Sequence, residues 1–370
     1  MIGGIFLNKT KSKRIFYFDA LRTMAIIAVI VFHIFNDCNK LIVNEYTILS
    51  FNWIISDVMG NCFRFGVDLF LMLSGALSLG RVWDIKSFLG KRIPRIVLPF
   101  LFWGFILSLF MFVFTLFVPD LLGPIFKSHD IMGFLTYLYN SYMAKNTGFK
   151  QYWFFWMILG TYLIMPIFNK WLYNAELEEA EYFLVIWLVT CLFDSTLNIQ
   201  FPIKLSYFAG PIGMVVLGYY LRHTKRKVFN NKYTGPILIA FSSILLIFAS
   251  YLNSDATQFY VFDRYSILTA IEVAGIFLLF KNFHNFNINS RIIDKIEVPF
   301  KKFIFSIATY SYGIYLFHRV LLYISVKYMG KTVPYKPLIF ILFIVALIGS
   351  WIVLMILNRV PYLNQVIGAK

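Results

Sequence analysis

The sequence predicts an all-α membrane protein, a polytopic bundle of about ten transmembrane helices with the N-terminus inside. Of the 370 residues, 59% are hydrophobic and only 14% are charged, where soluble domains contain about 25% charged residues. The mean hydropathy is +0.71. A soluble protein of this length has no interior large enough for so many apolar side chains, which leaves lipid as their solvent.

A series of apolar stretches gives the number of helices. A helix needs roughly 17–25 mostly apolar residues to cross a bilayer. Stretches near this length are found at 16–36, 63–80, 96–118, 153–171, 182–198, 205–222, 236–252, 264–281, 304–326 and 338–358. We find no separate soluble domain and no internal repeat, so residues 1–370 are predicted to form one membrane domain.

Basic residues give the orientation. The net charge is +16, which in a soluble protein would suggest a nucleic-acid partner. Here Lys and Arg gather at alternate faces of the predicted bundle, and with an inside N-terminus the inner segments hold roughly twice as many as the outer ones. This asymmetry predicts a multi-pass protein of the plasma membrane with no nucleic-acid partner.

Two basic side chains lie inside the first predicted span. Arg22 and His33 are eleven residues apart, which at ~100° per residue places them on one face of a helix. The rise of ~1.5 Å per residue separates them by roughly 16 Å along the axis. Ionisable residues inside a span are costly unless they face protein or water. The spacing therefore predicts a polar passage with Arg22 near the inner surface and His33 toward the outer one.

This geometry suits a coenzyme A thioester, which carries phosphates at one end of an extended arm and the reactive thioester at the other. Arg22 would bind the phosphates with its forked donors. Neutral His33 would accept the proton of an attacking hydroxyl and return it to the leaving thiolate. The alternative is structural: Arg22 reaches the inner headgroups, and His33 forms a hydrogen bond within the bundle.

Acidic residues accompany this pair. Asp19 lies one turn before Arg22 and would neutralise it, while Asp37 lies one turn after His33 and would either orient the imidazole or sit as an interfacial acid. Asp68, in the second span, is within reach of His33 or Arg64. We take Asp37 and Asp68, with His33, as the candidate catalytic residues.

Further candidates lie near the inner surface and in the later spans. Arg92 and Arg95 flank Pro94 before the third span; beside Arg22 they mark a place for a polyanionic donor, although inner-face charge bias explains them too. In the later spans, the candidate acceptor-binding residues are Glu272, Tyr315 and His318, for which a structural role is the alternative.

The three cysteines exclude a disulfide framework, and none has the spacing of a metal site, so no metal is predicted. Cys38 and Cys62 border the first outer loop. They either form a disulfide or remain reduced at helix ends.

Several motifs, in order along nearly the whole chain, resemble the acyltransferase-3 family of membrane acyltransferases. They are FDALR at 18–22 followed by His33, GVDLF at 66–70 with LSG at 73–75, Arg92 and Arg95, YWF at 152–154 with Tyr162, Leu163 and Pro166, and YGIYLFH at 312–318.

Members of this family move acyl groups, most often acetyl, from cytoplasmic acyl-CoA to hydroxyls of cell-surface glycans. The resemblance implies that Arg22 and His33 are the family's basic–ten–His pair, and that Arg92 and Arg95 are its inner-loop arginine pair. It implies an O-acyltransferase, in the first place an O-acetyltransferase, with acetyl-CoA as donor, a glycan or glycolipid as acceptor, and membrane lipids around it.

Two other functions remain open from the sequence. A transporter or flippase of a glycan or lipid precursor would also place buried charges among ten helices, but it is expected to show inverted repeats and broken helices. A sensor or scaffold of the cell envelope would leave the donor-sized spacing of Arg22 and His33 without a purpose.

Overall fold

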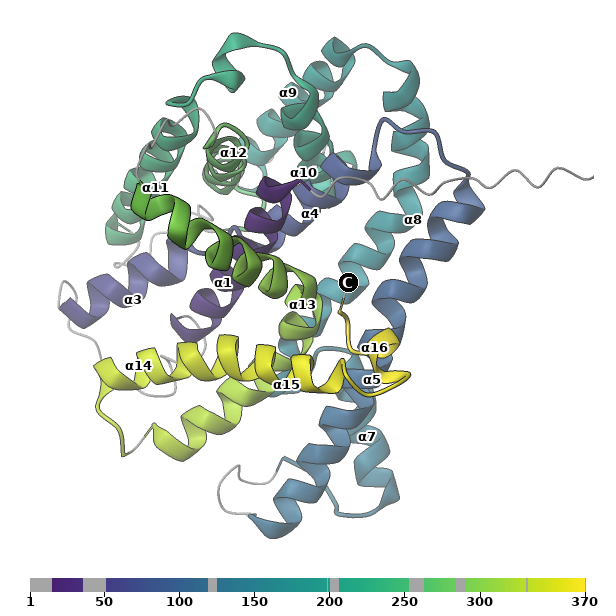
Figure 1. The fold of residues 1–370 in the computed structure, drawn as a ribbon, viewed down its shortest axis with the longest axis vertical. Coiled ribbons are helices and arrows are strands. Elements are labelled where there is room, and N and C mark those ends of the chain that lie inside the picture. The colour runs from purple at the N-terminus through teal and green to yellow at the C-terminus, as the bar shows by residue number, and fades with distance from the viewer. Residues whose placement is uncertain are drawn as a thin grey trace, which may run out of the picture.

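The computed structural model describes residues 15–35, 51–118, 125–197, 199, 206–252, 263–283, 291–330 and 332–369. Every regular element within these residues is helical (Figure 1), which confirms the predicted fold class. The elements are α1 (Phe16–His33), α3 (Phe51–Cys62), α4 (Gly66–Ser78), α5 (Ile85–Phe117), α7 (Ile131–Tyr142), η2 (Thr147–Tyr152), α8 (Trp153–Asn174), α9 (Leu177–Phe193), α10 (Ser206–His223), η3 (Lys227–Asn230), α11 (Thr234–Leu252), α12 (Ile267–Lys281), α13 (Arg291–Met329), α14 (Tyr335–Ile344), η6 (Val345–Gly349), α15 (Ser350–Leu357) and α16 (Leu363–Val366).

Each of the ten predicted stretches contains a helix, but fewer helices have the length and composition of a span. Within the described residues, four helical runs are long and apolar enough to cross a membrane: Phe16–His33, Ile85–Phe117, Thr147–Asn174 and Tyr335–Leu357. Several of the others are short, and α10 is broken at Gly210, which has a non-helical ψ of −140°. The chain is a membrane protein by its apolar helices, and the number of ten spans stays a prediction.

Helix α1 lies at the centre of the bundle, where α4 and α13 pack directly against it (Figure 1). Its small and branched side chains fill the contact: Leu21, Ala25, Ile26, Ala28 and Ile30 are fully buried. Because α1 is enclosed by protein, the polar side chains that it carries face other helices or cavities rather than lipid, as their cost in hydrocarbon demands.

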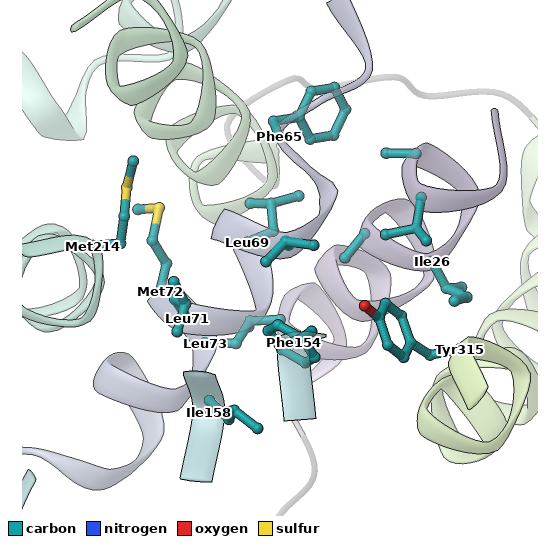
Figure 2. Close-up of a cluster of buried hydrophobic side chains, with 14 of the residues drawn as sticks. Ile26, Phe65, Leu69, Leu71, Met72, Leu73, Phe154, Ile158, Met214 and Tyr315 are labelled. Carbon is teal, nitrogen blue, oxygen red and sulfur yellow. The ribbon is translucent and has the colours of Figure 1, made fainter. Parts of the chain in front are cut away.

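Aromatic and aliphatic side chains from α1, α4, α8, α10 and α13 form the core around this helix (Figure 2). Lipid tails are as apolar as leucine, so these contacts alone do not drive the helices together; close packing and interhelical hydrogen bonds do. Two such bonds hold α13: Thr23 Oγ1 donates to the Ile304 carbonyl (3.1 Å) and Tyr312 Oη donates to the Ile96 carbonyl (2.8 Å).

Helix α5 extends well beyond a single span and begins outside the apolar region. Its N-terminus is capped by Asp84, whose carboxylate accepts the Ser87 N–H at 3.0 Å. The first turns are basic and largely exposed, and the apolar part follows Pro94 and Pro99. Helix α5 thus joins an exposed basic segment to a long apolar segment that is able to cross a membrane.

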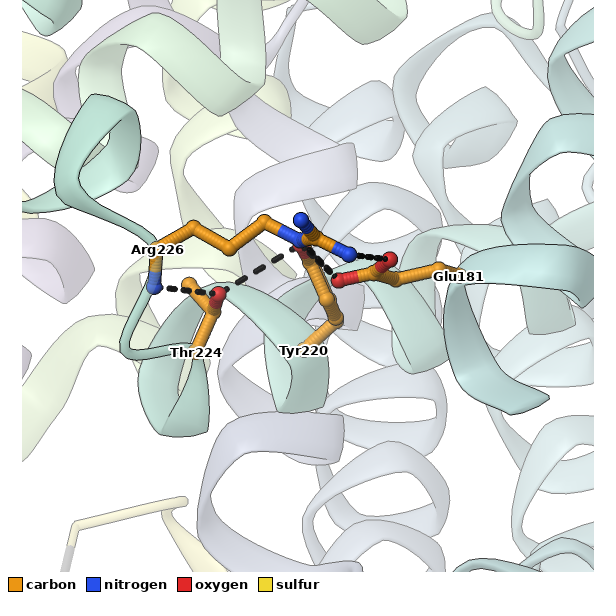
Figure 3. A network of polar contacts seen from close by, with 4 residues as sticks. All are labelled: Glu181, Tyr220, Thr224 and Arg226. Atoms are coloured by element: carbon orange, nitrogen blue, oxygen red, sulfur yellow. Dashed lines mark hydrogen bonds and ion pairs between the residues drawn. The ribbon is translucent and has the colours of Figure 1, made fainter. Parts of the chain in front are cut away.

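A polar network joins α9 to the end of α10 and to the segment that follows it (Figure 3). Glu181 accepts hydrogen bonds from the Arg226 guanidinium and from Tyr220 Oη, the latter at 2.7 Å, while Thr224 Oγ1 accepts the Arg226 N–H at 3.3 Å. The Arg226 side chain is 57% exposed. Such an exposed pair contributes little stability, so its main effect is to fix where α9 begins relative to α10.

Two glycines bring α4 and α10 into backbone contact. A Cβ added at Gly75 would lie 1.8 Å from the Val215 carbonyl oxygen, and one added at Gly218 would lie 2.0 Å from the Met72 carbonyl oxygen. No side chain fits at either position without moving a helix. The absence of a side chain at these two positions is what lets the two helices approach so closely.

We therefore expect Gly75→Ala to destabilise the protein. The added methyl group meets a backbone atom that cannot rotate away, and overpacking of this kind costs about 1–3 kcal/mol. Gly160→Ala is the matched control, because Gly160 is also helical and its added Cβ would meet nothing within 4 Å. Thermal unfolding of the purified protein in detergent should show a lower Tm for Gly75→Ala only. Equal Tm values for the two variants would contradict the packing.

Candidate functional site

Helix α1 places Arg22 in its second turn and His33 in its last turn, roughly 16 Å apart along the axis. His33 is 7% exposed, while the Arg22 side chain is 35% exposed. Directly after His33 the helix widens into a π turn at residues 34–35, a distortion that is frequent at functional sites. The two side chains therefore lie at opposite ends of the buried central helix.

A cavity of about 440 Å³ lies at the Arg22 end. Three guanidinium groups line it, Arg22 from α1 with Arg92 and Arg95 from α5, and we call it the arginine cavity. Hydroxyl-bearing side chains such as Ser74 and Ser311 complete its wall. The fold thus brings together three arginines that the sequence placed in two separate motifs.

Two of the three arginines, Arg22 and Arg92, are held in place by neighbouring groups. Arg22 Nη1 donates to Asp19 Oδ1 at 3.0 Å, and Asp19 is only 1% exposed. Arg92 Nη2 donates to Ser78 Oγ at 2.8 Å, and its guanidinium carbon lies 5.7 Å from the centre of the Phe88 ring. Asp19 offsets one of the three positive charges, as predicted for it. Guanidinium groups are forked donors, which suit the geometry of phosphate and carboxylate anions.

A second cavity, of about 340 Å³, lies at the His33 end. We call it the histidine cavity. Its wall includes two further cations, Arg64 and Arg264, and the aromatic side chains of Trp153 and Tyr265. The imidazole is therefore open to a polar, aromatic space that is distinct from the arginine cavity.

Tyr315 of α13 lines both cavities. Its hydroxyl donates to the Gln151 carbonyl at 2.7 Å, and its ring lies 5.1 Å from that of Phe154 (Figure 2). The sequence predicts one polar passage from Arg22 to His33; among the described residues, separate cavities lie at Arg22 and at His33, and this side chain borders both. A ligand extending from the arginines to the imidazole has to pass beside Tyr315.

His318 lies one turn after Tyr315 and is fully buried. Its ring centre is 5.4 Å from that of His33. Its Nδ1 lies 3.0 Å from the Ile314 carbonyl oxygen and 2.9 Å from that of Tyr315. Carbonyl oxygens only accept, so Nδ1 carries the proton and Nε2 presents a lone pair. His318 lies next to His33 but does not line the histidine cavity. Its predicted role in binding the acceptor stays a prediction.

Among the described residues, two of the acidic candidates line neither cavity. Asp68 is fully buried, and neither carboxylate oxygen has a hydrogen-bond partner within the described residues. Its catalytic role stays a prediction. Glu272 is 2% exposed on α12 and borders neither cavity among the described side chains. Asp37 and Cys38 lie outside the described residues, and their predicted roles stay predictions.

Sequence reasoning missed part of the histidine cavity. Trp153 was noted only as part of a motif, and Asp263, Arg264 and Tyr265 were not selected at all. The available signal was a short charged and aromatic segment at the start of the predicted span 264–281. This segment is far from His33 along the chain, so the sequence does not indicate that they lie close together. The packing of α12 against α1 brings the segment and His33 together.

A family model described as an acyltransferase domain matches residues 15–355, nearly the whole chain. The match includes both ends of α1 and almost every residue that lines the two cavities, with Gly368 of the arginine cavity beyond it. No curated protein and no solved structure matches the chain.

Proposed function

Because the chain belongs to the acyltransferase family whose model matches it, we propose that it transfers an acyl group from acyl-coenzyme A to a hydroxyl of a cell-surface glycan or glycolipid. As a member of this family it is a membrane acyltransferase. The finer points are the proposal: acetyl-CoA as the donor in the first place, a saccharide hydroxyl as the acceptor, and a catalytic role for His33.

One observation carries the proposal: a cavity with three arginines and a cavity with His33 lie at the two ends of α1, and both border Tyr315. Coenzyme A presents several phosphate oxygens at one end and the thioester at the other. The arginines are suited to the phosphates, and the roughly 16 Å between Arg22 and His33 suits the extended arm. The thioester would then lie beside Tyr315, at the border of the histidine cavity.

The transfer needs a base at that border. The acceptor hydroxyl oxygen attacks the thioester carbonyl carbon, so that a C–O bond forms and the C–S bond breaks. His33 accepts the hydroxyl proton as the attack proceeds and gives it to the departing thiolate, which leaves as free coenzyme A. His318 lies beside the His33 ring, with the two ring centres 5.4 Å apart, and a neutral His33 has one protonated nitrogen and one nitrogen able to accept.

The orientation follows from the basic loops. With the N-terminus inside, the arginine cavity opens toward the cytoplasm, where acyl-CoA is made available, and the histidine cavity opens toward the outside. The protein would then be a multi-pass protein of the plasma membrane that moves an acyl group across it without moving coenzyme A.

An assay with sealed proteoliposomes tests this function. Radiolabelled acetyl-CoA is supplied on one side only, and methyl glycosides are supplied on the other. We expect acetylated glycoside on the side opposite the donor, identified by mass spectrometry, with free coenzyme A remaining on the donor side. Movement of unmodified glycoside without any ester would contradict the proposal and favour a transporter.

A further inference from the structure

The wall of the arginine cavity includes a glycine that follows α16. Gly368 lines this cavity, and Tyr362, whose φ is +67°, makes the turn into α16. We call residues 362–369 the wall segment; it lies against α5 (Figure 1) and beyond the residues that the family model matches. Because glycine has no side chain, Gly368 presents main-chain atoms to a ligand in the cavity.

A buried hydrogen bond holds the wall segment against α5. The Ile367 carbonyl accepts the indole N–H of Trp103 at 3.1 Å, and both residues are buried. The Ile367 N–H donates to the Leu363 carbonyl, also at 3.1 Å. The centre of the Trp103 ring lies 4.9 Å from that of Phe317 on α13. The wall segment is therefore fixed beside two helices whose side chains line the cavity.

Close main-chain packing positions Gly368 itself. Its φ is +82°, a conformation that favours glycine. A Cβ added at Gly368 would lie 2.9 Å from the Gly313 nitrogen, and one added at Gly313 would lie 2.4 Å from the Ile367 carbonyl oxygen. Glycine at both positions thus lets the wall segment lie directly on α13, next to Tyr312, which also lines the cavity.

Gly368 brings main-chain polar groups to a cavity whose cations come from side chains. Both main-chain groups of Ile367 are paired, whereas no hydrogen bond within the described residues pairs the N–H or the carbonyl of Gly368. Gly368 is buried, and buried main-chain groups nearly always have a partner. A ligand in this cavity therefore meets a neutral donor and a neutral acceptor in addition to the three guanidinium groups.

The arm of coenzyme A has the complementary chemistry. Phosphates are strong acceptors and suit guanidinium donors, but the arm between the phosphates and the thioester is neutral and carries amide groups. An amide both donates and accepts, as a peptide group does, and extended peptides bind to a main chain through such hydrogen bonds. The arm can thus pair with Gly368 where a phosphate would favour the arginines.

We propose that the main chain of Gly368 binds an amide group of the coenzyme A arm and so directs the thioester from the arginines toward Tyr315. The proposal rests on the proposed function for the identity of the donor. It gives the wall segment a part in donor binding that is separate from that of the arginines, because the arginines bind the phosphates and Gly368 binds the arm.

Amide hydrogen exchange tests this contact without any acyl transfer. The protein is placed in nanodiscs, and exchange in the wall segment is followed by mass spectrometry with saturating coenzyme A, pantetheine or adenosine 3′,5′-bisphosphate. We expect coenzyme A and pantetheine to slow exchange at Gly368, because both contain the arm. Adenosine 3′,5′-bisphosphate contains phosphates but no arm, and it should leave this exchange unchanged.

The Gly368→Ala variant gives a kinetic test. The added methyl group meets the main chain of α13, so the wall segment has to move. We expect KM to rise about tenfold for both acetyl-CoA and S-acetylpantetheine, as for the loss of one hydrogen bond, with kcat little changed. Gly133→Ala is the matched control: its added Cβ would lie 1.9 Å from the Ser128 carbonyl oxygen, and Gly133 lines neither cavity.

Trp103→Phe serves the same purpose should Gly368→Ala fail to fold. It removes the indole N–H that binds the Ile367 carbonyl and keeps an aromatic ring. KM for the two donors should rise together, by a smaller factor. Trp156→Phe is its control, because the Trp156 indole N–H also donates to a carbonyl, at 2.9 Å, and Trp156 lines neither cavity.

Exchange at Gly368 that pantetheine leaves unchanged would overturn the inference, as would a KM rise in Gly368→Ala for acetyl-CoA but not for S-acetylpantetheine. Equal KM changes in Gly368→Ala and Gly133→Ala would overturn it too. Equal slowing by adenosine 3′,5′-bisphosphate and coenzyme A would place the phosphates at the wall segment, which also contradicts it. A protein that binds coenzyme A and pantetheine in this way but transfers no acyl group would leave this inference standing and refute the proposed function.

Discussion

His33→Ala should lose acyl transfer while still binding coenzyme A. His33 lines the cavity that is proposed to bind the acceptor, so the acceptor would contact its imidazole. A general base contributes about 10²–10⁴-fold to the rate, so we expect kcat to fall by that factor. The coenzyme A site is expected to be unaffected, because its three arginines lie at the other end of α1.

The measurement is acetyl transfer together with the Kd of coenzyme A for the same preparation. His129→Ala is the matched control: His129 is exposed, and its Nε2 lies 3.2 Å from Thr115 Oγ1, away from both cavities. Should the His33→Ala protein transfer acetyl within a few-fold of the unmodified protein, His33 is not the base. Loss of coenzyme A binding in His33→Ala would point to disturbed folding or to a single shared site.

Replacement of the arginines that line the arginine cavity should weaken the binding of acetyl-CoA rather than slow the acyl-transfer step. For Arg22→Gln, Arg92→Gln and Arg95→Gln we expect the KM for acetyl-CoA to rise about tenfold or more each, since each removes a charged donor to phosphate. A donor without nucleotide phosphates, S-acetylpantetheine, should show no such rise. The difference between the two donors isolates the phosphate contacts from any general change in the protein.

Lys86→Gln provides the charge-matched control. Lys86 lies on the same helix α5, is exposed, and does not line the arginine cavity. Its KM for acetyl-CoA should change little. A parallel rise in KM for acetyl-CoA and for S-acetylpantetheine in the arginine variants would mean that these side chains shape the cavity without holding the phosphates.

The sequence alone predicted the parts of this molecule that depend on local periodicity. Eleven residues bring a helix through about three turns, which is enough to assign Arg22 and His33 to one helix and to its opposite ends. Ten apolar stretches each contain a helix, because apolar length is what the bilayer selects. The short α3 and α7 fell in predicted loops, since helices of 12 residues have no span-length signal.

The parts that depend on packing were not predictable. Nothing in the local sequence indicates that Tyr315 would divide the space between Arg22 and His33, because its position depends on how α13 crosses α1. The stacking of Arg264 on Trp153 joins the start of α8 to the segment before α12, which is distant along the chain. The number of membrane spans also depends on packing. Helices such as α4 are surrounded by protein, so the thickness of the lipid alone does not set their length.

We propose that one donor molecule reaches from the arginines past Tyr315 to the imidazole. An experimental structure with a non-reactive acetyl-CoA analogue, in which the thioester sulfur is replaced by a methylene group, tests this most directly. We expect its phosphates beside Arg22, Arg92 and Arg95, its arm displacing or skirting the Tyr315 ring, and its carbonyl carbon near His33. Phosphates bound away from these arginines, or a carbonyl that stays on the far side of Tyr315 from the imidazole, would contradict the account.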